Sequence, residues 1–312
     1  MIKLLSLPLA IVLITTTAAS AQDGEACRTV RLSDPGWTDI TATNGVASVV
    51  LEALGYTPDV STLSVPVGYE AMKGGEIDVF LGNWMPAQQA FRNDLDAAGA
   101  AEVLTQNLEG AKFTLAVPTY VAEAGVTDFA DLTANAEKFG SEIYGIEPGA
   151  PANQNLQRMI ESGDFGLEGW EVVESGEQAM LAQVGRAEPS EDWIVFLAWA
   201  PHPMNTEYDL EYLAGGDAYF GPDFGGADVF TLSRTGWAEA CPNAAQLFRN
   251  LVFTVEMENE LMGFILDDGM SPEESAEAWL AEHPDVLGPW LEGVTTLEGE
   301  PGLPAVQGTL GL

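Results

Sequence analysis

Apolar and polar positions alternate along this chain with two different periods. Short apolar runs, typical of buried strands, are separated by longer segments in which apolar residues recur every three or four positions, as on one face of a helix. Over the first part of the chain this pattern predicts strands at 29–33, 60–65 and 77–81, with helices at 40–54 and 69–73 between them. A β-α-β-α-β order implies a parallel sheet with right-handed crossovers.

A second alternating series begins after Gly110. The pattern predicts strands at 112–117, 142–146, 171–174, 193–198, 210–214 and 228–232, and helices at 128–139, 151–162, 177–186, 244–266 and 272–281. A chain of 312 residues is long enough for two lobes with separate cores.

The N-terminal segment has the composition of an export signal. Lys3 is followed by an apolar stretch, 4–14, that is too short to span a bilayer, and the small residues Ala19 and Ala21 suit signal peptidase. A membrane anchor would need about 20 apolar residues, and threonines interrupt this run. We therefore predict that 1–21 is a signal peptide cleaved before Gln22 and that the mature protein is periplasmic.

The cysteine count agrees with export. The chain has 2 Cys, Cys27 and Cys241, and an even number in an exported protein favours one disulfide, the alternative being two buried free thiols. That bond would return the late part of the chain to the first lobe. The prediction is an α/β fold with two lobes and a ligand cleft between them, the architecture of a periplasmic binding protein: 22–111 and 206–312 form lobe 1, which is discontinuous, and 112–205 form lobe 2.

The charge excludes one class of partner. Asp and Glu total 48 against 11 Lys and Arg, which gives a formal net charge of -37. Phosphate backbones and anionic lipid surfaces would repel such a chain, so nucleic acid is not an expected partner. We interpret the acidic residues mainly as a solvated surface, with steering of cationic ligands as a secondary effect that salt screens.

Three tryptophans lie where predicted strands run out into loops. Trp37, Trp84 and Trp199 each follow a short apolar run, and side chains at the carboxyl end of a strand in an open α/β sheet point into the ligand crevice. Several indoles converging there would form a cage that attracts methylated ammonium cations through the negative faces of the rings. A carboxylate, Asp39, lies two residues after Trp37.

The same segments carry a family resemblance. The motifs are SDPGWTDI at 33–40, DVFLGNWMP at 78–86, IYGIEPG at 143–149, WAPHPMN at 199–205 and GPDFGGA at 221–227. With them the mature chain resembles, over essentially its whole length, the substrate-binding proteins of ABC transporters for quaternary amines, most closely the choline-binding proteins of proteobacteria.

The resemblance implies a ligand site. It assigns Trp37, Trp84 and Trp199 as walls around a trimethylammonium group and Asp39 as the acceptor for the charge and hydroxyl of the ligand. Phe113, in KFTLA at 112–116, stands where the family has a tyrosine, so a ring is kept and a phenol is lost.

A second departure concerns the hydroxyl. The family asparagine expected after 147–149 is absent, and Asn153 is the candidate to replace it, the alternative being a plain helix-capping or solvated residue. These two departures leave glycine betaine, carnitine or a sulfonium analogue open beside choline.

The implied function is capture of choline and its delivery to a permease at the inner membrane. We expect a monomer without a cofactor or metal. An enzyme is disfavoured because the chain has 2 His and lacks the Gly-x-Ser-x-Gly, His-Glu-x-x-His and phosphate-loop motifs. A secreted hydrolase using a carboxylate pair is the alternative from another class. His202 is expected to have a structural role in the hinge, or else to meet a ligand carboxylate.

Overall fold

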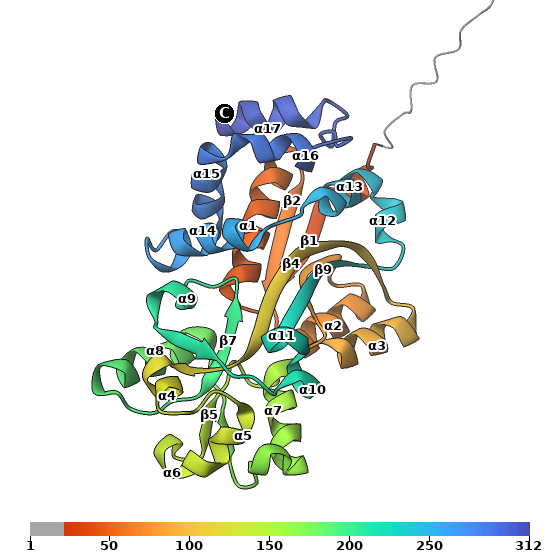
Figure 1. The fold of residues 1–312 in the computed structure, drawn as a ribbon. Helices are drawn as coiled ribbons and strands as arrows, with labels where there is room; N and C mark the ends of the chain where they lie inside the picture. Colours follow the sequence, from red (N-terminus) through yellow and green to blue (C-terminus); the bar gives the residue numbers. More distant parts are fainter. Residues whose placement is uncertain (1–21) are drawn as a thin grey trace, which may run out of the picture.

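A computed structural model describes residues 22–312, so the predicted signal peptide, 1–21, lies outside the described residues. Within them the strands form one continuous mixed sheet in the order β2-β1-β3-β9-β4-β7-β5-β6, with β8 paired to β4 (Figure 1). The strands are β1 Thr29–Asp34, β2 Thr57–Thr62, β3 Val79–Met85, β4 Ala101–Pro118, β5 Glu142–Tyr144, β6 Glu171–Val173, β7 Phe196–Ala200, β8 Leu210–Tyr212 and β9 Gly226–Arg234.

The predicted parallel pairing holds at both ends of the sheet. β1 runs parallel to β2 and β3, and β5 runs parallel to β6 and β7. The centre corrects the expectation of a parallel sheet, because β9 is antiparallel to both β3 and β4, and β4 is antiparallel to β7. Two long strands running in opposite directions therefore join the two parallel units.

β4 is much longer than the strand predicted at 112–117. Its first part, from residue 101 to 112, pairs with β9, and its second part, from 112 to 116, pairs with β7. The register against β9 shifts three times, which breaks the alternation that would have marked 101–111 as a strand. The change of partner falls at the predicted lobe boundary of 112, and the lobe limits stay a prediction.

The longer helices are α1 Thr38–Ala53, α2 Val65–Gly74, α3 Gln89–Ala98, α7 Pro151–Ser162, α8 Glu177–Ala187, α13 Pro242–Asn250, α14 Val255–Leu266, α15 Pro272–Glu282 and α17 Gly302–Leu310. The shorter ones are α4 Thr119–Glu123, α5 Phe129–Leu132, α6 Ala136–Phe139, α9 Met204–Glu207, α10 Asp217–Phe220, α11 Pro222–Gly225, α12 Trp237–Ala240 and α16 Leu287–Trp290. α14 and α15 pack against α1 at the top of Figure 1, and α4 to α8 surround β5 at the bottom. No helix in residues 22–312 is long and apolar enough to cross a bilayer.

Two predicted helices are interrupted. The helix expected at 128–139 is α5 and α6, separated by a 3₁₀ turn. The helix expected at 244–266 breaks between α13 and α14, where the amide of Phe253 donates to the carbonyl of Asn107 in β4 and the Thr254 side chain caps α14 by accepting from the amide of Met257. A backbone bond to the sheet replaces helical bonding there.

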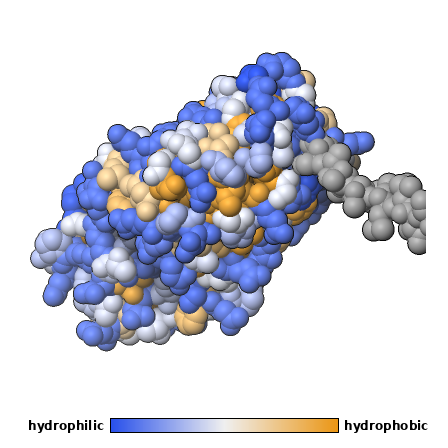
Figure 2. Space-filling view, turned by 90° about the horizontal axis from the view of Figure 1, so that it is seen from above, coloured by the Kyte–Doolittle hydropathy of each residue, from blue (hydrophilic) through white to orange (hydrophobic). Residues whose placement is uncertain are grey.

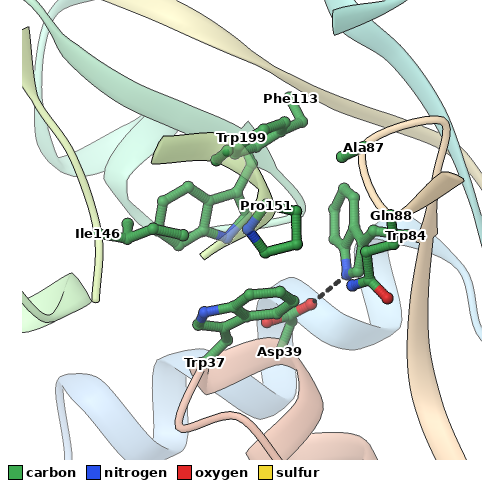
Figure 3. Close-up of a pocket in the computed structure, with 10 residues that line it drawn as sticks. Trp37, Asp39, Trp84, Ala87, Gln88, Phe113, Ile146, Pro151 and Trp199 are labelled. Carbon is green, nitrogen blue, oxygen red and sulfur yellow. Dashed lines mark hydrogen bonds between the residues drawn. The ribbon is translucent and has the colours of Figure 1, made fainter. Parts of the chain in front are cut away.

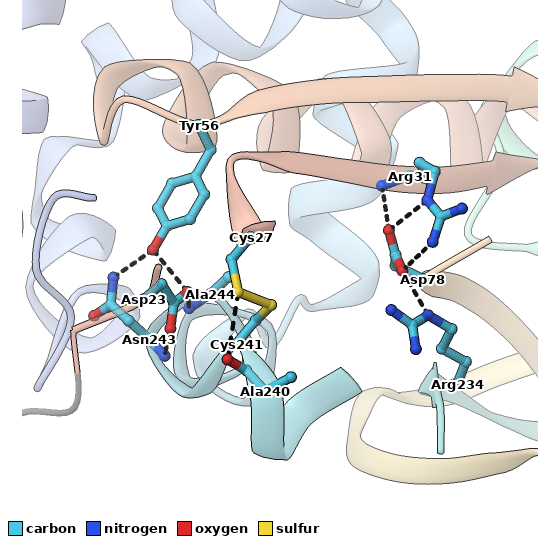
Figure 4. Close-up of a disulfide and its surroundings, with 10 residues drawn as sticks. All are labelled: Asp23, Cys27, Arg31, Tyr56, Asp78, Arg234, Ala240, Cys241, Asn243 and Ala244. Atoms are coloured by element: carbon cyan, nitrogen blue, oxygen red, sulfur yellow. Dashed lines mark hydrogen bonds and ion pairs between the residues drawn. A yellow bond between two sulfur atoms is a disulfide. The ribbon is translucent and has the colours of Figure 1, made fainter. Parts of the chain in front are cut away.

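The Cys27–Cys241 disulfide is confirmed, with the two Cα atoms 5.6 Å apart across 214 residues of sequence (Figure 4). Near it, the buried carboxylate of Asp78 receives Arg31 of β1 and Arg234 of β9, each at 2.7 Å. Burial opposes ionisation of Asp78, but the two guanidinium groups outweigh it and hold its pKa below the usual value. The disulfide and the ion pairs of Asp78 both hold the later part of the chain against the first strands.

The surface carries the excess of acidic side chains. The face in Figure 2 is mainly hydrophilic, with a band of hydrophobic residues across its middle. Arg28, Lys73 and Arg92 form exposed or half-exposed ion pairs with neighbouring carboxylates. Exposed pairs of this kind contribute little stability, on the order of 0 to 1 kcal/mol each, so the burial of the sheet and its helices is what holds the fold.

Candidate functional site

Five of the six predicted site residues line one cavity in the middle of the molecule. They are Trp37, Asp39, Trp84, Phe113 and Trp199 (Figure 3). Ala87, Gln88, Ile146, Pro151 and Ala152 complete the lining. The sheet and the starts of two helices position these side chains. The sheet contributes the carboxyl ends of β3 and β7 and the second half of β4, and the helices contribute the first turns of α1 and α7.

The four rings enclose the cavity from different sides. Phe113 and Trp199 are paired residues on β4 and β7, with ring centroids 6.5 Å apart, and Phe113 lies 6.4 Å from Trp84 at an angle of 64°. Each of the four rings is at most 9% exposed. Figure 3 shows Trp37 on the opposite side of the space from Phe113. Such a desolvated set of ring faces attracts a cation whose charge is spread over methyl groups.

Asp39 is the charged side chain of the cavity lining, and it is half satisfied. It is 1% exposed, and its Oδ2 accepts a hydrogen bond of 3.0 Å from Nε1 of Trp84. Its Oδ1 is buried and has no partner among the described residues. Burial, with the charge of Glu177 adding to it, raises the pKa of Asp39 to about 8. A cation in the cage would supply a counter-charge for this carboxylate.

Few other polar atoms of the lining are available. The amide of Gln88 is used in the core, where it accepts from the Tyr69 hydroxyl at 2.6 Å and donates to the Gly82 carbonyl at 2.8 Å. Nε1 of Trp37 donates to Glu147 Oε2 at 2.9 Å. No Lys, Arg or His belongs to this lining. The cavity therefore combines ring faces with one free carboxylate oxygen.

Glu177, which sequence reasoning missed, holds the first turn of α1, which carries Asp39. Its carboxylate accepts from the amide of Thr38 at 3.0 Å and from the Thr38 hydroxyl, and so caps the first turn of α1 across 139 residues of sequence. His202 Nε2 lies 3.1 Å from the same carboxylate. Burial opposes the charge of Glu177, but the bonds from His202 and Thr38 outweigh it and keep its pKa below the usual value.

His202 makes its hydrogen bonds within the protein, and the hinge role expected from the sequence stays a prediction. It is 1% exposed and does not line the cavity. Its Nδ1 accepts the amide of Met204 at 2.9 Å, so the ring proton is on Nε2, which donates to Glu177. The residue orients the carboxylate that holds α1.

Asn153 differs from the other five predicted ligand residues. The structure does not bring its side chain into the cavity. Its Oδ1 accepts the amide of Ile146 at 3.0 Å, and its Nδ2 donates to the carbonyls of Ile146 and Glu147 at 2.9 and 3.0 Å. These backbone groups belong to the loop after β5, where the two carbonyls also accept from the amides of Ser175 and Ala150, so the asparagine helps to fix the loop that carries Ile146.

The described residues contain no group of His, Cys, Asp and Glu side chains arranged to hold a metal ion. The fold and the cavity together define a solute-binding protein of the two-lobe type. Residues 28–282 match the model of the OpuAC family, the substrate-binding domain of ABC-type glycine betaine transport systems, and the chain belongs to this family.

Three solved structures show what the chain is similar to. An ABC-transporter choline-binding protein in complex with choline is 52% identical, with a TM-score of 0.91, over 92% of this chain and 100% of that one. A choline-binding protein in an unliganded semi-closed conformation is 53% identical over the same shares, with a TM-score of 0.85. Lactococcal OpuAC, closed on glycine betaine, is 27% identical, with a TM-score of 0.76, over 84% of this chain and 99% of that one. The described structure is thus more similar to the choline complex than to the unliganded form.

Proposed function

We propose that the protein is the periplasmic choline receptor of an ABC importer. The observation that carries the proposal is the cage of four aromatic rings around a buried carboxylate oxygen of Asp39 that no described residue bonds. A trimethylammonium group fits the rings because its weak hydration is replaced by their faces. The hydroxyl of choline can donate to Asp39 Oδ1.

Choline ranks above glycine betaine on charge. The carboxylate of betaine would enter a cavity whose lining has no cationic side chain and already holds Asp39. Once Asp39 is ionised to pair with the ammonium group, a second carboxylate at such close range in a buried site is unfavourable. Carnitine carries a carboxylate too and meets the same objection, whereas a sulfonium analogue with a hydroxyl keeps the features that the site recognises.

The proposed role needs no catalysis. The receptor is exported, acts as a monomer, closes around choline and presents the closed form to a permease at the inner membrane. Closure joins Glu177 to Thr38 and Glu147 to Trp37, so the same first turn of α1 that carries Asp39 also carries the contacts of closure. Ligand occupancy and lobe position are therefore linked through one turn of helix.

The test is a calorimetric panel of choline, glycine betaine, carnitine and a sulfonium analogue, together with 3,3-dimethylbutan-1-ol, which replaces the nitrogen of choline by carbon. Choline should bind most tightly, and the neutral isostere should bind much more weakly. Trp84→Ala and Trp199→Ala should each weaken choline by roughly 1 to 3 kcal/mol. An isostere that binds as tightly as choline would show that the cage does not read charge.

A further inference from the structure

A second cavity adjoins the cage. It is a groove of about 410 Å³, against about 30 Å³ for the cage by the same measure. Ala87 and Pro151 line both spaces, so the groove and the cage share part of their walls. Choline alone leaves the groove unused.

One face of α7 leads from the cage into the groove. Pro151 lies at the cage, and Gln154, Asn155 and Arg158 follow at the third, fourth and seventh positions after it, which places all four on one side of the helix. Seven residues of helix span about 10 Å. Side chains on a helix lean toward its N-terminus, so Arg158 extends back toward the cage.

Arg158 is held in that position and is not neutralised by an ion pair. Its guanidinium donates to Oδ1 of Asn155, and Asn155 is itself fixed, at 4% exposure, by donating from Nδ2 to the carbonyl of Tyr219 in α10 at 3.0 Å. Figure 1 shows α7 and α10 next to each other. Among residues 22–312 no carboxylate forms an ion pair with Arg158, although the chain has 48 acidic residues. It is the basic side chain that lines this groove.

We infer that the groove is a second subsite, which takes the phosphate of a choline phosphodiester whose quaternary ammonium group occupies the cage. The inference rests on the proposed function. In a diester the choline oxygen is esterified and cannot donate to Asp39 Oδ1, so the short two-carbon linker runs toward Ala87 and Pro151 instead of toward Asp39. The phosphate then meets the guanidinium of Arg158, which binds phosphate oxygens through charge-assisted hydrogen bonds. Asp217 and Gln154 also line the groove and offer acceptor and amide groups to the hydroxyls of the second alcohol.

The charge of the ligand decides between phosphate esters. A choline phosphodiester has one negative and one positive charge, so it is neutral overall and approaches a chain of net charge -37 without repulsion. A phosphomonoester carries up to two negative charges and is disfavoured by the same field. The diester also fills more of the groove.

The experiment is titration calorimetry of glycerophosphocholine and of choline against the parent protein, Arg158→Gln and the control Arg249→Gln. The control makes the same change of charge at an exposed residue of α13, outside the groove. Glycerophosphocholine should bind the parent with a dissociation constant within about a hundredfold of that of choline. Arg158→Gln should weaken glycerophosphocholine by about tenfold or more and choline by less than about twofold. The control should leave both unchanged.

The other outcomes separate this inference from the proposed function. If choline binds and glycerophosphocholine does not, or if Arg158→Gln weakens both ligands equally or neither, the subsite is wrong and the choline receptor stands. Trp84→Ala should weaken both ligands; glycerophosphocholine binding that survives it would place the diester outside the cage and overturn the subsite. If neither ligand binds the parent, the proposed function itself fails.

Discussion

Choline affinity should fall as the pH is lowered below about 8, because Asp39 must be ionised to pair with the cation. Burial and the charges of Glu177 and Asp34 raise the pKa of Asp39 to about 8 in the ligand-free site. Glu258, on the packed helix α14, is also buried and has its pKa raised, first by burial and then by Asp39. At neutral pH the empty site therefore holds mainly a protonated Asp39, and choline, whose charge is permanent, displaces that proton.

Two opposing free energies set the contribution of Asp39 to choline binding. With an effective dielectric constant of about 20 and a separation of about 4.5 Å, the attraction between the cation and the carboxylate is about 3.7 kcal/mol. Ionising Asp39 one pH unit below its pKa costs about 1.4 kcal/mol. The net contribution at pH 7 is then about 2.3 kcal/mol, or about fiftyfold in affinity.

The assay is calorimetry of choline binding from about pH 6 to about pH 9. The dissociation constant of the parent should rise by about tenfold per unit below pH 8 and level off above it. Asp39→Asn should bind about 500-fold more weakly than the parent at its plateau and show no slope. Trp199→Phe is the control, since a smaller ring lowers affinity at every pH without changing the slope. A parent affinity that stays constant over this range, or a slope that persists in Asp39→Asn, would refute the role given to Asp39.

Three further variants test lobe closure, the loop that carries Ile146 and the stability of the fold. Glu177→Ala should weaken choline by roughly 1 to 2 kcal/mol, since the cap on α1 is lost; calorimetric affinity equal to that of the parent would rule out a part in closure. Asn153→Ala should lower the free energy of unfolding by about 1 to 3 kcal/mol, because the buried amide of Ile146 loses its acceptor, and an unchanged urea midpoint would contradict this. Replacing Cys27 and Cys241 by Ala should cost about 2 to 5 kcal/mol of stability in urea, with choline affinity within about twofold of the parent; a large loss of affinity would mean that the bond shapes the site.

The ring walls of the site were predictable because they follow from strand order. Trp84 and Trp199 lie at the carboxyl ends of β3 and β7, where an open α/β sheet presents ligand-binding side chains, and a short apolar run before each was enough to locate it. Asp39 and Phe113 came from the resemblance. Their positions in the cavity depend on pairing between β4 and β7 and on the first turn of α1, which local pattern does not describe.

The features that the sequence did not predict share a physical cause, which is contact between residues far apart in the sequence. The first part of β4 is a strand because β9 returns beside it, and its bulges hide the alternation. The helix break before α14 depends on a bond to β4, and nothing near Glu177 in sequence indicates that it meets Thr38. For Asn153 the position was informative but the direction of the side chain was not, because three backbone groups compete for it.

Two buried carboxylates, Asp39 and Glu177, lie at the first turn of α1, and their different hydrogen-bond partners give them different roles. Glu177 is surrounded by donors from Thr38 and His202, so its charge is satisfied without a ligand and its pKa lies below the usual value. Asp39 is just as buried but receives one donor, so its charge is unsatisfied and its pKa is raised to about 8. Glu177 also contributes to that rise, so the ionised form of Asp39 is electrostatically unfavourable in the empty site. The positive charge of choline between the rings favours the ionised form of Asp39, and the choline hydroxyl completes the hydrogen bonding of Oδ1. A neutral molecule of the same shape keeps the hydroxyl but supplies no charge to pair with the carboxylate.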